Sequence, residues 1–230
     1  VKSHLAQALL LGGYFREGWR KFEIRLNSPA MVAKQSVMPG DIWRGQDLTD
    51  KHLLIWCEQG FGDAIQFLRF VSLVTVEARQ VTLLCPDRLK LLLNSFDGAI
   101  TILDNVKFSC DVDFNLPLMS LPYLMGLESI LESNPYLFAD SNLIDHWDKI
   151  LGYRGKPRIG ISWQGNPAYE ADHQRSIPLS YLQPLFLNRN YEFVSLQRGF
   201  GCEQLSNFSN DIVVLGEDVD ESGAFVDTAA

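Results

Sequence analysis

The apolar positions near the N-terminus repeat with helical spacing. Residues 5–26 carry one apolar stripe, which Gly12 and Gly13 interrupt before an aromatic stripe begins. This pattern predicts a helix, a turn and a second helix, which we assign to a helical hairpin over residues 1–27. Residues 28–50 show no period and contain several Pro and Gly residues, so we expect a linker there.

From residue 52 onward, continuous apolar runs alternate with longer amphipathic segments. The runs at 52–58, 81–86 and 99–104 have strand length and no polar face, as expected for strands buried on both sides of a sheet. Residues 64–78 lie between two of these runs and indicate a helix with a narrow polar stripe. This alternation predicts a parallel, doubly wound sheet, which we assign to a first α/β domain over 51–153.

A second α/β domain is expected over residues 157–230. Three short apolar runs predict its strands, at 158–165, 191–197 and 211–217. Residues 179–187 predict a helix, and Pro184 must lie in its first turn or kink it. The chain is therefore expected to be an α/β protein with two Rossmann-like domains, the second incomplete, preceded by a short helical hairpin.

Composition and charge narrow the class of protein. Of the 230 residues, 47% are hydrophobic and 21% are charged, which is typical of a globular protein rather than a disordered chain. The formal net charge of -8 argues against a nucleic-acid binder, which needs a basic surface. Because the sequence has neither a membrane-span-length apolar run nor a signal peptide, we expect no membrane span and a cytoplasmic location. Both ends look cut, so we treat the chain as a fragment.

Cysteine and histidine usage gives no sign of a metal site. The four cysteines have no CxxC spacing, and the four histidines have no HExxH or similar ligand spacing. Cys57 and Cys85 fall inside apolar runs, where a buried free thiol is the usual interpretation. We therefore expect a reducing compartment and neither a structural nor a catalytic metal.

The first candidate site is the turn after the first buried strand, at the sheet edge where α/β proteins bind ligands. Gln59, Gly60 and Gly62 build this turn, and its glycines allow a ligand to approach the backbone closely. Asp63 opens the following helix, whose dipole stabilises an ionised carboxylate that can act as a general base. Gln66, one helical turn further on, belongs to the same candidate site. The alternative for Asp63 is an ordinary residue of the first helical turn.

This turn does not match a dinucleotide-binding fingerprint. The pattern Gly-x-Gly-x-x-Gly would need a glycine where Ile65 stands. No clean acidic residue ends the second strand either, because Asp87 follows a proline. An NAD-type site is therefore disfavoured.

The second candidate site follows the first strand of the second domain. Its residues are Trp163, Gly165, Asn166, His173, Arg175 and Ser176. Arg175 offers a planar fork of donors suited to a phosphate, and the alternative is an ion pair with Asp172 or Glu170. A lone loop histidine such as His173 is more often simply solvated. Gln197 ends the next strand on the same sheet edge, where a plain turn is the alternative interpretation.

Several short segments together resemble one family. The segments are WCEQGFGDAIQFLRF, ISWQGNP with DHQRSIPL, FVSLQRG and VDTAA. They look like the C-terminal region of bacterial tetratricopeptide-repeat proteins with a glycosyltransferase-like domain. FREGWRKFEIR is similar to the last repeat helix before that domain, although only one such unit is visible. The likeness covers most of the chain and extends more distantly to heptosyltransferases and to the O-linked N-acetylglucosamine transferase catalytic region.

The resemblance implies a GT-B architecture, in which two Rossmann-like domains face each other across a cleft. It implies inverting, metal-independent transfer of a hexosyl or heptosyl group from a nucleotide-sugar donor to a hydroxyl of a protein or glycan acceptor. The nucleotide-sugar is then a substrate, and no cofactor is implied. The family pattern puts the general base at Asp63 and a donor-phosphate contact at Arg175, so both should face one cleft.

One departure from the family pattern concerns the donor site. Asp227-Thr228 resembles an Asp-Thr-Ala-Ala element, whereas the later Asp-Thr segment followed by His, which holds the donor nucleotide, does not occur in these residues. Donor binding and turnover by this chain alone are therefore in doubt. The rival interpretation is a non-catalytic interaction protein, with a protein partner on the tetratricopeptide-like unit and a GT-B-like scaffold. The sequence does not contain the Tyr-x-x-x-Lys pair that a nucleotide-dependent epimerase would need, so that interpretation is disfavoured.

Overall fold

The computed structural model describes residues 2–58, 60–105, 111–130, 134–152, 155–208 and 210–230. Its contacts divide the chain into two compact units. The first unit comprises Val1–Ala139 together with Ser222–Val226, and the second comprises Asp140–Glu221 together with Asp227–Ala230. The helix at 141–151 thus groups with the second unit, whereas the sequence pattern assigned it to the first domain.

The first unit begins with two short helices, α1 (Lys2–Leu11) and α2 (Phe15–Phe22). The predicted break between them is present, with Gly13 in the left-handed region at φ 80°. Gly18 of α2 is buried, and a Cβ there would lie 2.7 Å from Leu10 Cδ2. The two helices therefore pack too closely at this point for a larger residue.

The segment that we expected to be an irregular linker contains regular structure. It holds helix α3 (Pro29–Ser36) and strand β1 (Asp41–Ile42), and the 3-10 helix η1 (Glu23–Asn27) directly precedes it. Ser28 caps α3 by accepting a hydrogen bond from Met31 N at 3.3 Å, and proline stands in the first turn. The expectation of an irregular segment was wrong because this capping signal outweighs the absence of an apolar period.

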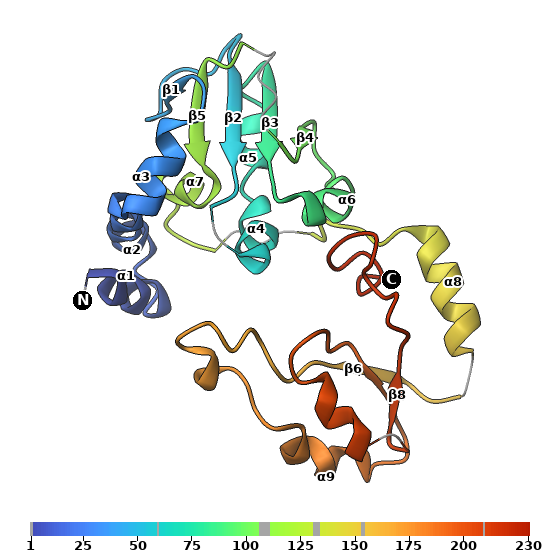
Figure 1. Cartoon of the computed structure of the whole chain (residues 1–230). Coiled ribbons are helices and arrows are strands. Elements are labelled where there is room, and N and C mark those ends of the chain that lie inside the picture. The colour runs from blue at the N-terminus through green and yellow to red at the C-terminus, as the bar shows by residue number, and fades with distance from the viewer. Residues whose placement is uncertain (1, 59, 106–110, 131–133, 153–154, 209) are drawn as a thin grey trace. The chain divides into compact units, whose positions relative to one another are not determined.

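A five-stranded parallel sheet forms the centre of the first unit, in the order β1-β5-β2-β3-β4. Besides β1, its strands are β2 (His52–Trp56), β3 (Gln80–Leu84), β4 (Thr101–Leu103) and β5 (Phe114–Pro117). Every residue of β2 is buried, as its continuous apolar run predicts. The parallel α/β architecture expected from the sequence is thus confirmed, and Figure 1 shows β5, β2 and β3 side by side.

Short helices connect these strands. They are α4 (Phe61–Leu68), α5 (Ser72–Thr75), η2 (Asp87–Leu89), α6 (Lys90–Leu93), η3 (Leu118–Ser120) and α7 (Leu121–Leu124). The single helix expected over 64–78 is instead split into α4 and α5. Three of its β-branched residues, Val74, Thr75 and Val76, lie at its end, where such side chains lower helix propensity. Phe67, Leu68 and Val71 nevertheless enter the core, as the amphipathic pattern predicts.

The second unit contains a smaller parallel sheet in the order β6-β7-β8. Its elements are α8 (Ser141–Leu151), β6 (Arg158–Ile161), η4 (Asp172–Gln174), η5 (Leu179–Leu182), α9 (Gln183–Phe186), β7 (Glu192–Ser195), η6 (Cys202–Asn207) and β8 (Ile212–Val214). Pro184 lies in the first turn of α9, as its missing N–H requires. Gly160 of β6 is exposed and Ile159 is 37% exposed, because β6 is an edge strand rather than the fully buried strand that we expected.

Each unit has its own apolar core. The core of the second unit gathers Ile161, Trp163, Leu179, Phe186, Phe193, Leu205, Phe208 and Ile212. In the first unit the core gathers side chains from one face of the parallel sheet, including Leu53, Ile55 and Leu83, and it includes Ala224 from the returning C-terminal segment. Within the described part of the chain, none of the helices is long and apolar enough to cross a bilayer.

Candidate functional site

The β2–α4 turn brings the first candidate residues to the carboxyl end of the central strand. In Figure 1 helix α4 follows the arrowhead of β2. Asp63 lies in the first turn of α4, and its Oδ2 accepts a hydrogen bond from Gly60 N at 3.2 Å. Its second oxygen makes no hydrogen bond with any described residue. Asp63 thus helps to cap the first turn of α4 and also keeps one carboxylate oxygen available. Gln59 lies outside the described residues.

A hollow of about 550 Å³ opens beside this turn. Asp63 and Gln66 line it on the side of α4, and Trp19 and Phe22 line it on the side of α2. Its volume falls within the range of small-molecule sites, and its walls are mostly apolar with a few polar side chains, as such sites usually are. The predicted residues Asp63 and Gln66 therefore share one hollow in the first unit.

The fold does not require glycine at either position of the turn. Gly60 has an ordinary extended backbone at φ -71°, and a Cβ there would meet only Asp63 Oδ2, at 3.8 Å. A Cβ on Gly62, which is exposed, would have no neighbour within 4 Å. The backbone beside Asp63 is consequently open to close approach from outside the protein.

A buried ionic network that sequence reasoning missed lies next to this turn. Arg25 of η1 donates from Nε and Nη2 to both oxygens of Glu58, at 2.8 Å each, directly after β2. Ser120, after β5, accepts from Arg25 at 2.8 Å and donates to Glu23. The Glu58 side chain is fully buried and also accepts from Met119 N at 3.0 Å.

This network covers the carboxyl ends of two neighbouring strands, β2 and β5. From β2 the chain steps to β3 and β4 on one side, and β5 returns on the other side of β2. The carboxyl ends of β2 and β5 are therefore the topological switch point, where open α/β sheets usually bind ligands. Here Arg25 and Glu23 from the N-terminal segment cover that point. Burial lowers the pKa of Arg25, but the hydrogen bond and attraction of Glu58 outweigh burial and raise that pKa.

In the second unit, the loop after β6 brings Arg175 against Asp172. Arg175 Nε donates to Asp172 Oδ1 at 2.8 Å, and its guanidinium lies 5.0 Å from the centre of the Tyr169 ring. The ion-pair alternative for Arg175 is therefore realised. Its side chain is still 55% exposed, and neither Nη atom bonds a described residue. Arg175 thus retains donors that face outward from the pair.

Ser176 and Gly165 stabilise the Asp172 side of this ion pair. Ser176 Oγ donates to Asp172 Oδ2 at 2.8 Å and accepts from Gly165 N at 2.9 Å. A Cβ on Gly165 would lie 2.5 Å from both Asp172 Oδ1 and Arg175 Nη2. The loop therefore requires glycine at position 165. The Ser176 hydroxyl is used in hydrogen bonds within the loop and is not free to bind a ligand.

Gln197 follows the carboxyl end of β7, where we expected it, but its side chain bonds the protein itself. Its Oε1 accepts from Trp163 N at 2.9 Å and Gln164 N at 3.0 Å, and its Nε2 donates to Gln164 O and Phe200 O. Both ends of the amide are thus used within the protein, where they join the loops after β6 and β7. Gln204 extends this arrangement by donating to Gln164 Oε1 at 3.1 Å, a contact that sequence reasoning missed.

The remaining predicted residues have separate surroundings. Trp163 belongs to the core, and its indole N–H is buried with no acceptor among the described residues. Asn166 accepts from Ala168 N at 2.9 Å in a local turn. His173 is exposed and contacts only its own loop, through Glu170 O at 3.2 Å. These residues surround Arg175 in sequence, but each has its own structural role.

The Asp-Thr element near the C-terminus is held by a local network of hydrogen bonds. Asp220, with a left-handed backbone, accepts from Asp227 N at 2.8 Å and from Thr228 N at 3.0 Å. Asp227 in turn accepts from Asp220 N at 2.8 Å and from Trp147 Nε1 of α8 at 3.1 Å. Asp227 and Thr228 are therefore occupied in fixing this loop against α8. The part of the chain that is described contains no cluster of three or more His, Cys, Asp or Glu side chains placed to hold a metal ion.

Comparison with known proteins gives one distant relative. No protein-family model matches the chain, and no solved structure matches it. The chain is similar to Protein FlbA of Caulobacter vibrioides, with 27% identity over 228 residues that cover 90% of this chain. It spans only 38% of the length of FlbA.

Proposed function

We propose that this chain is part of a metal-independent, inverting glycosyltransferase of GT-B type. In this proposal an acceptor hydroxyl attacks the anomeric carbon of a nucleotide-sugar, and the bond from that carbon to the diphosphate oxygen breaks. Asp63 takes the hydroxyl proton as general base, and Arg175 stabilises the negative charge that develops on the leaving nucleoside diphosphate. The family resemblance of the sequence is the source of this assignment of roles.

The observation that carries the proposal is the position of Asp63. Its carboxylate lies at the carboxyl end of β2, on the wall of the 550 Å³ hollow, with one oxygen free of hydrogen bonds to described residues. A general base needs an unoccupied oxygen within reach of a bound hydroxyl. Gly60 and Gly62, which the fold itself does not require, leave the approach to that oxygen open.

The donor side of the proposal depends on Arg175. The guanidinium is oriented by Asp172 and by the Tyr169 ring, while its two Nη atoms make no bond to described residues. A guanidinium held in this way can donate two parallel hydrogen bonds to a phosphate. Asp172 offsets part of the positive charge, so Arg175 supplies orientation and donors as much as net charge.

Donor binding and transfer test the two roles separately. The complete gene product is titrated with UDP-, ADP-, GDP- and CMP-sugars by calorimetry, and transfer is followed as donor consumption. We expect Arg175→Ala to weaken donor binding by roughly tenfold or more, the loss of a charge-assisted hydrogen bond. Asp63→Asn should retain donor affinity and lower turnover by roughly a hundredfold to ten-thousandfold. Asp87→Asn, the same change at the exposed turn after β3, is the matched control.

Three results would contradict the proposal. Equal donor affinity in the wild type and in Arg175→Ala would remove Arg175 from the donor site. Unchanged turnover in Asp63→Asn would remove the general base, and a protein that binds a nucleotide-sugar without any turnover would favour the interaction-protein interpretation, with a protein partner on the α1–α2 hairpin.

A further inference from the structure

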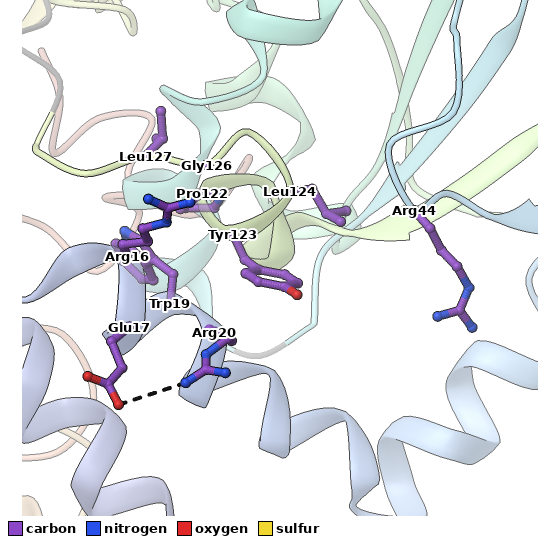
Figure 2. A pocket seen from close by; sticks show the side chains of 10 residues that line it. All are labelled: Arg16, Glu17, Trp19, Arg20, Arg44, Pro122, Tyr123, Leu124, Gly126 and Leu127. Atoms are coloured by element: carbon purple, nitrogen blue, oxygen red, sulfur yellow. Dashed lines mark ion pairs between the residues drawn. The ribbon is translucent and has the colours of Figure 1, made fainter.

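A second hollow in the first unit is rich in arginine. We call it the arginine pocket and define it by Arg16, Glu17, Trp19, Arg20, Arg44 and Tyr123. Its volume is about 760 Å³, within the range of small-molecule sites. Figure 2 shows Tyr123 of α7 between the two arginines of α2 and Arg44, which follows β1. Three guanidinium groups and one carboxylate therefore surround a single hollow.

The three arginines are poorly neutralised by the protein. Arg16 pairs with Glu128 at 3.0 Å, but both side chains are more than half exposed, so the pair contributes little. Arg20 lies 3.9 Å from Glu17, at the limit of an ion pair. The Arg44 guanidinium makes no hydrogen bond or ion pair with the described residues. This local excess of positive charge stands out on a chain with a formal net charge of -8.

We propose that the arginine pocket binds a small phosphorylated ligand that carries a flat ring. One guanidinium satisfies both oxygens of a carboxylate, whereas a phosphate monoester has three terminal oxygens and nearly two charges. A hollow lined by three guanidinium groups therefore favours phosphate over carboxylate. Tyr123 lines the hollow and is 40% exposed, and an aromatic ring of this kind can stack on a planar group. This site does not depend on the proposed sugar transfer, because neither Asp63 nor Arg175 lines it.

Three small probes separate the elements of this proposal. Inorganic phosphate supplies the charge alone, benzoate supplies a ring with a carboxylate, and phenyl phosphate supplies both the ring and the phosphate. Calorimetry on the purified chain at low salt should give the highest affinity for phenyl phosphate and the lowest for benzoate. Added salt should weaken phenyl phosphate binding, because exposed charges are screened. Tyr123→Leu should bring the affinity for phenyl phosphate down toward that for inorganic phosphate.

Variants of exposed arginines then locate the bound phosphate. Arg44→Gln should weaken phenyl phosphate binding by roughly tenfold to a hundredfold, the loss of a charge-assisted hydrogen bond. Arg189→Gln is the matched control, because Arg189 is also an exposed arginine, paired with Asp211 at 3.2 Å in the second unit. The Trp19 indole N–H has no acceptor among the described residues and its side chain lines the pocket, so its NMR signal should shift on binding.

Any of three outcomes would overturn the proposal. The first is an absence of phenyl phosphate binding at low salt. The second is an equal loss of affinity in Arg44→Gln and Arg189→Gln, which would indicate general attraction to positive charge. The third is binding that leaves the Trp19 indole signal unmoved, which would mean that the ligand occupies another surface. A glutamate-rich peptide that binds when phenyl phosphate does not would reassign the pocket to acidic peptides.

Discussion

Arg25 and Glu58 form a two-point ion pair that joins the N-terminal segment to the end of the central strand. Arg25 Nε and Nη2 lie 2.8 Å from the two carboxylate oxygens, and the side chains are 8% and 0% exposed. The guanidinium thus lies at the switch point of the sheet, next to the carboxyl end of β2. Glu58 lies between β2 and α4, the helix that carries Asp63, so this pair also holds the end of the strand from which the candidate site is reached.

The first prediction concerns the stability that depends on this pair. Arg25→Met removes the guanidinium and leaves the Glu58 carboxylate buried, with Met119 N as the remaining donor. We expect the free energy of unfolding to fall by about 3–5 kcal/mol, the usual result of breaking a buried pair. Urea unfolding followed by circular dichroism measures this loss.

The surface pair of Arg16 with Glu128 is the control for that experiment. Both of its side chains are mostly exposed, so Arg16→Met should cost less than about 1 kcal/mol. Replacing both Arg25 and Glu58 by Met should recover part of the stability lost in Arg25→Met, because the fully buried Glu58 carboxylate is then no longer present without its partner. Similar urea midpoints for Arg25→Met and Arg16→Met would show that the pair is not buried as described.

Sequence patterns predicted most strands of both sheets, but neither strand β1 nor the long-range contact at the carboxyl end of β2. The strands β2, β3, β6 and β7 follow from continuous apolar runs, which need no information from elsewhere in the chain. The Arg25–Glu58 contact joins residues 33 positions apart, and nothing local marks either residue as a partner. Helix α3 has a local signal in the capping pair Ser28-Pro29, although its apolar residues show no helical period.

The candidate site shows a similar division between local and long-range information. The position of Asp63 at a strand-to-helix turn is a local property, and the structure agrees with it. Whether a polar side chain at a strand end faces outward or bonds the neighbouring loop depends on tertiary packing. Gln197 and Ser176 therefore looked like ligand-binding residues in the sequence, whereas their hydrogen bonds join loops of the second unit.

The second prediction concerns acid sensitivity of the Arg175 loop. The hydrogen bond from Arg175 holds the pKa of Asp172 below its usual value, with a further contribution from Ser176. A carboxylate whose pKa is lowered in the folded state stabilises the fold above its unfolded pKa of about 3.9. That stability is lost as the pH falls through the lower, folded pKa. Arg175→Ala should therefore raise the pKa of Asp172 and move the acid-induced loss of stability to higher pH.

Carboxyl-carbon NMR titration measures the pKa of Asp172 directly. Arg189→Gln removes the same charge from a distant surface of the second unit and serves as the control, so it should leave the Asp172 titration where it is in the wild type. An Asp172 titration that is identical in the wild type and in Arg175→Ala would mean that the ion pair does not form in solution.

The third prediction concerns thiol reactivity. Burial raises the pKa of Cys57 to about 12 and that of Cys85 to about 11. The thiolate is the reactive form, so both thiols should resist iodoacetamide in the folded protein at pH 8 and react once urea unfolds it. Cys202 is half-buried and should react first among these three, as peptide mass mapping would resolve. Labelling of Cys57 at the rate of Cys202 in the folded protein would contradict the burial of β2.

The fourth prediction compares two glycines of the two candidate loops, beginning with Gly165. A Cβ at this position would lie 2.5 Å from Asp172 Oδ1, which the bonds from Arg175 and Ser176 hold in place. The arginine end can move aside because it is largely exposed, but the aspartate cannot move without losing these partners. Gly165→Ala should therefore lower the free energy of unfolding by about 1–3 kcal/mol, the usual cost of overpacking.

Gly62→Ala should have the opposite effect on stability, because Gly62 lies in the first turn of α4 and a Cβ there would meet nothing within 4 Å. Alanine loses less conformational freedom than glycine in a helix, so we expect a gain of about 0.5–1 kcal/mol. If the glycine is there to admit a substrate, the same variant should lose transfer activity while it gains stability. Urea midpoints of both glycine variants measure the change in stability, and donor consumption measures the change in transfer activity. Gly62→Ala with unchanged activity would mean that no substrate approaches the backbone at this turn.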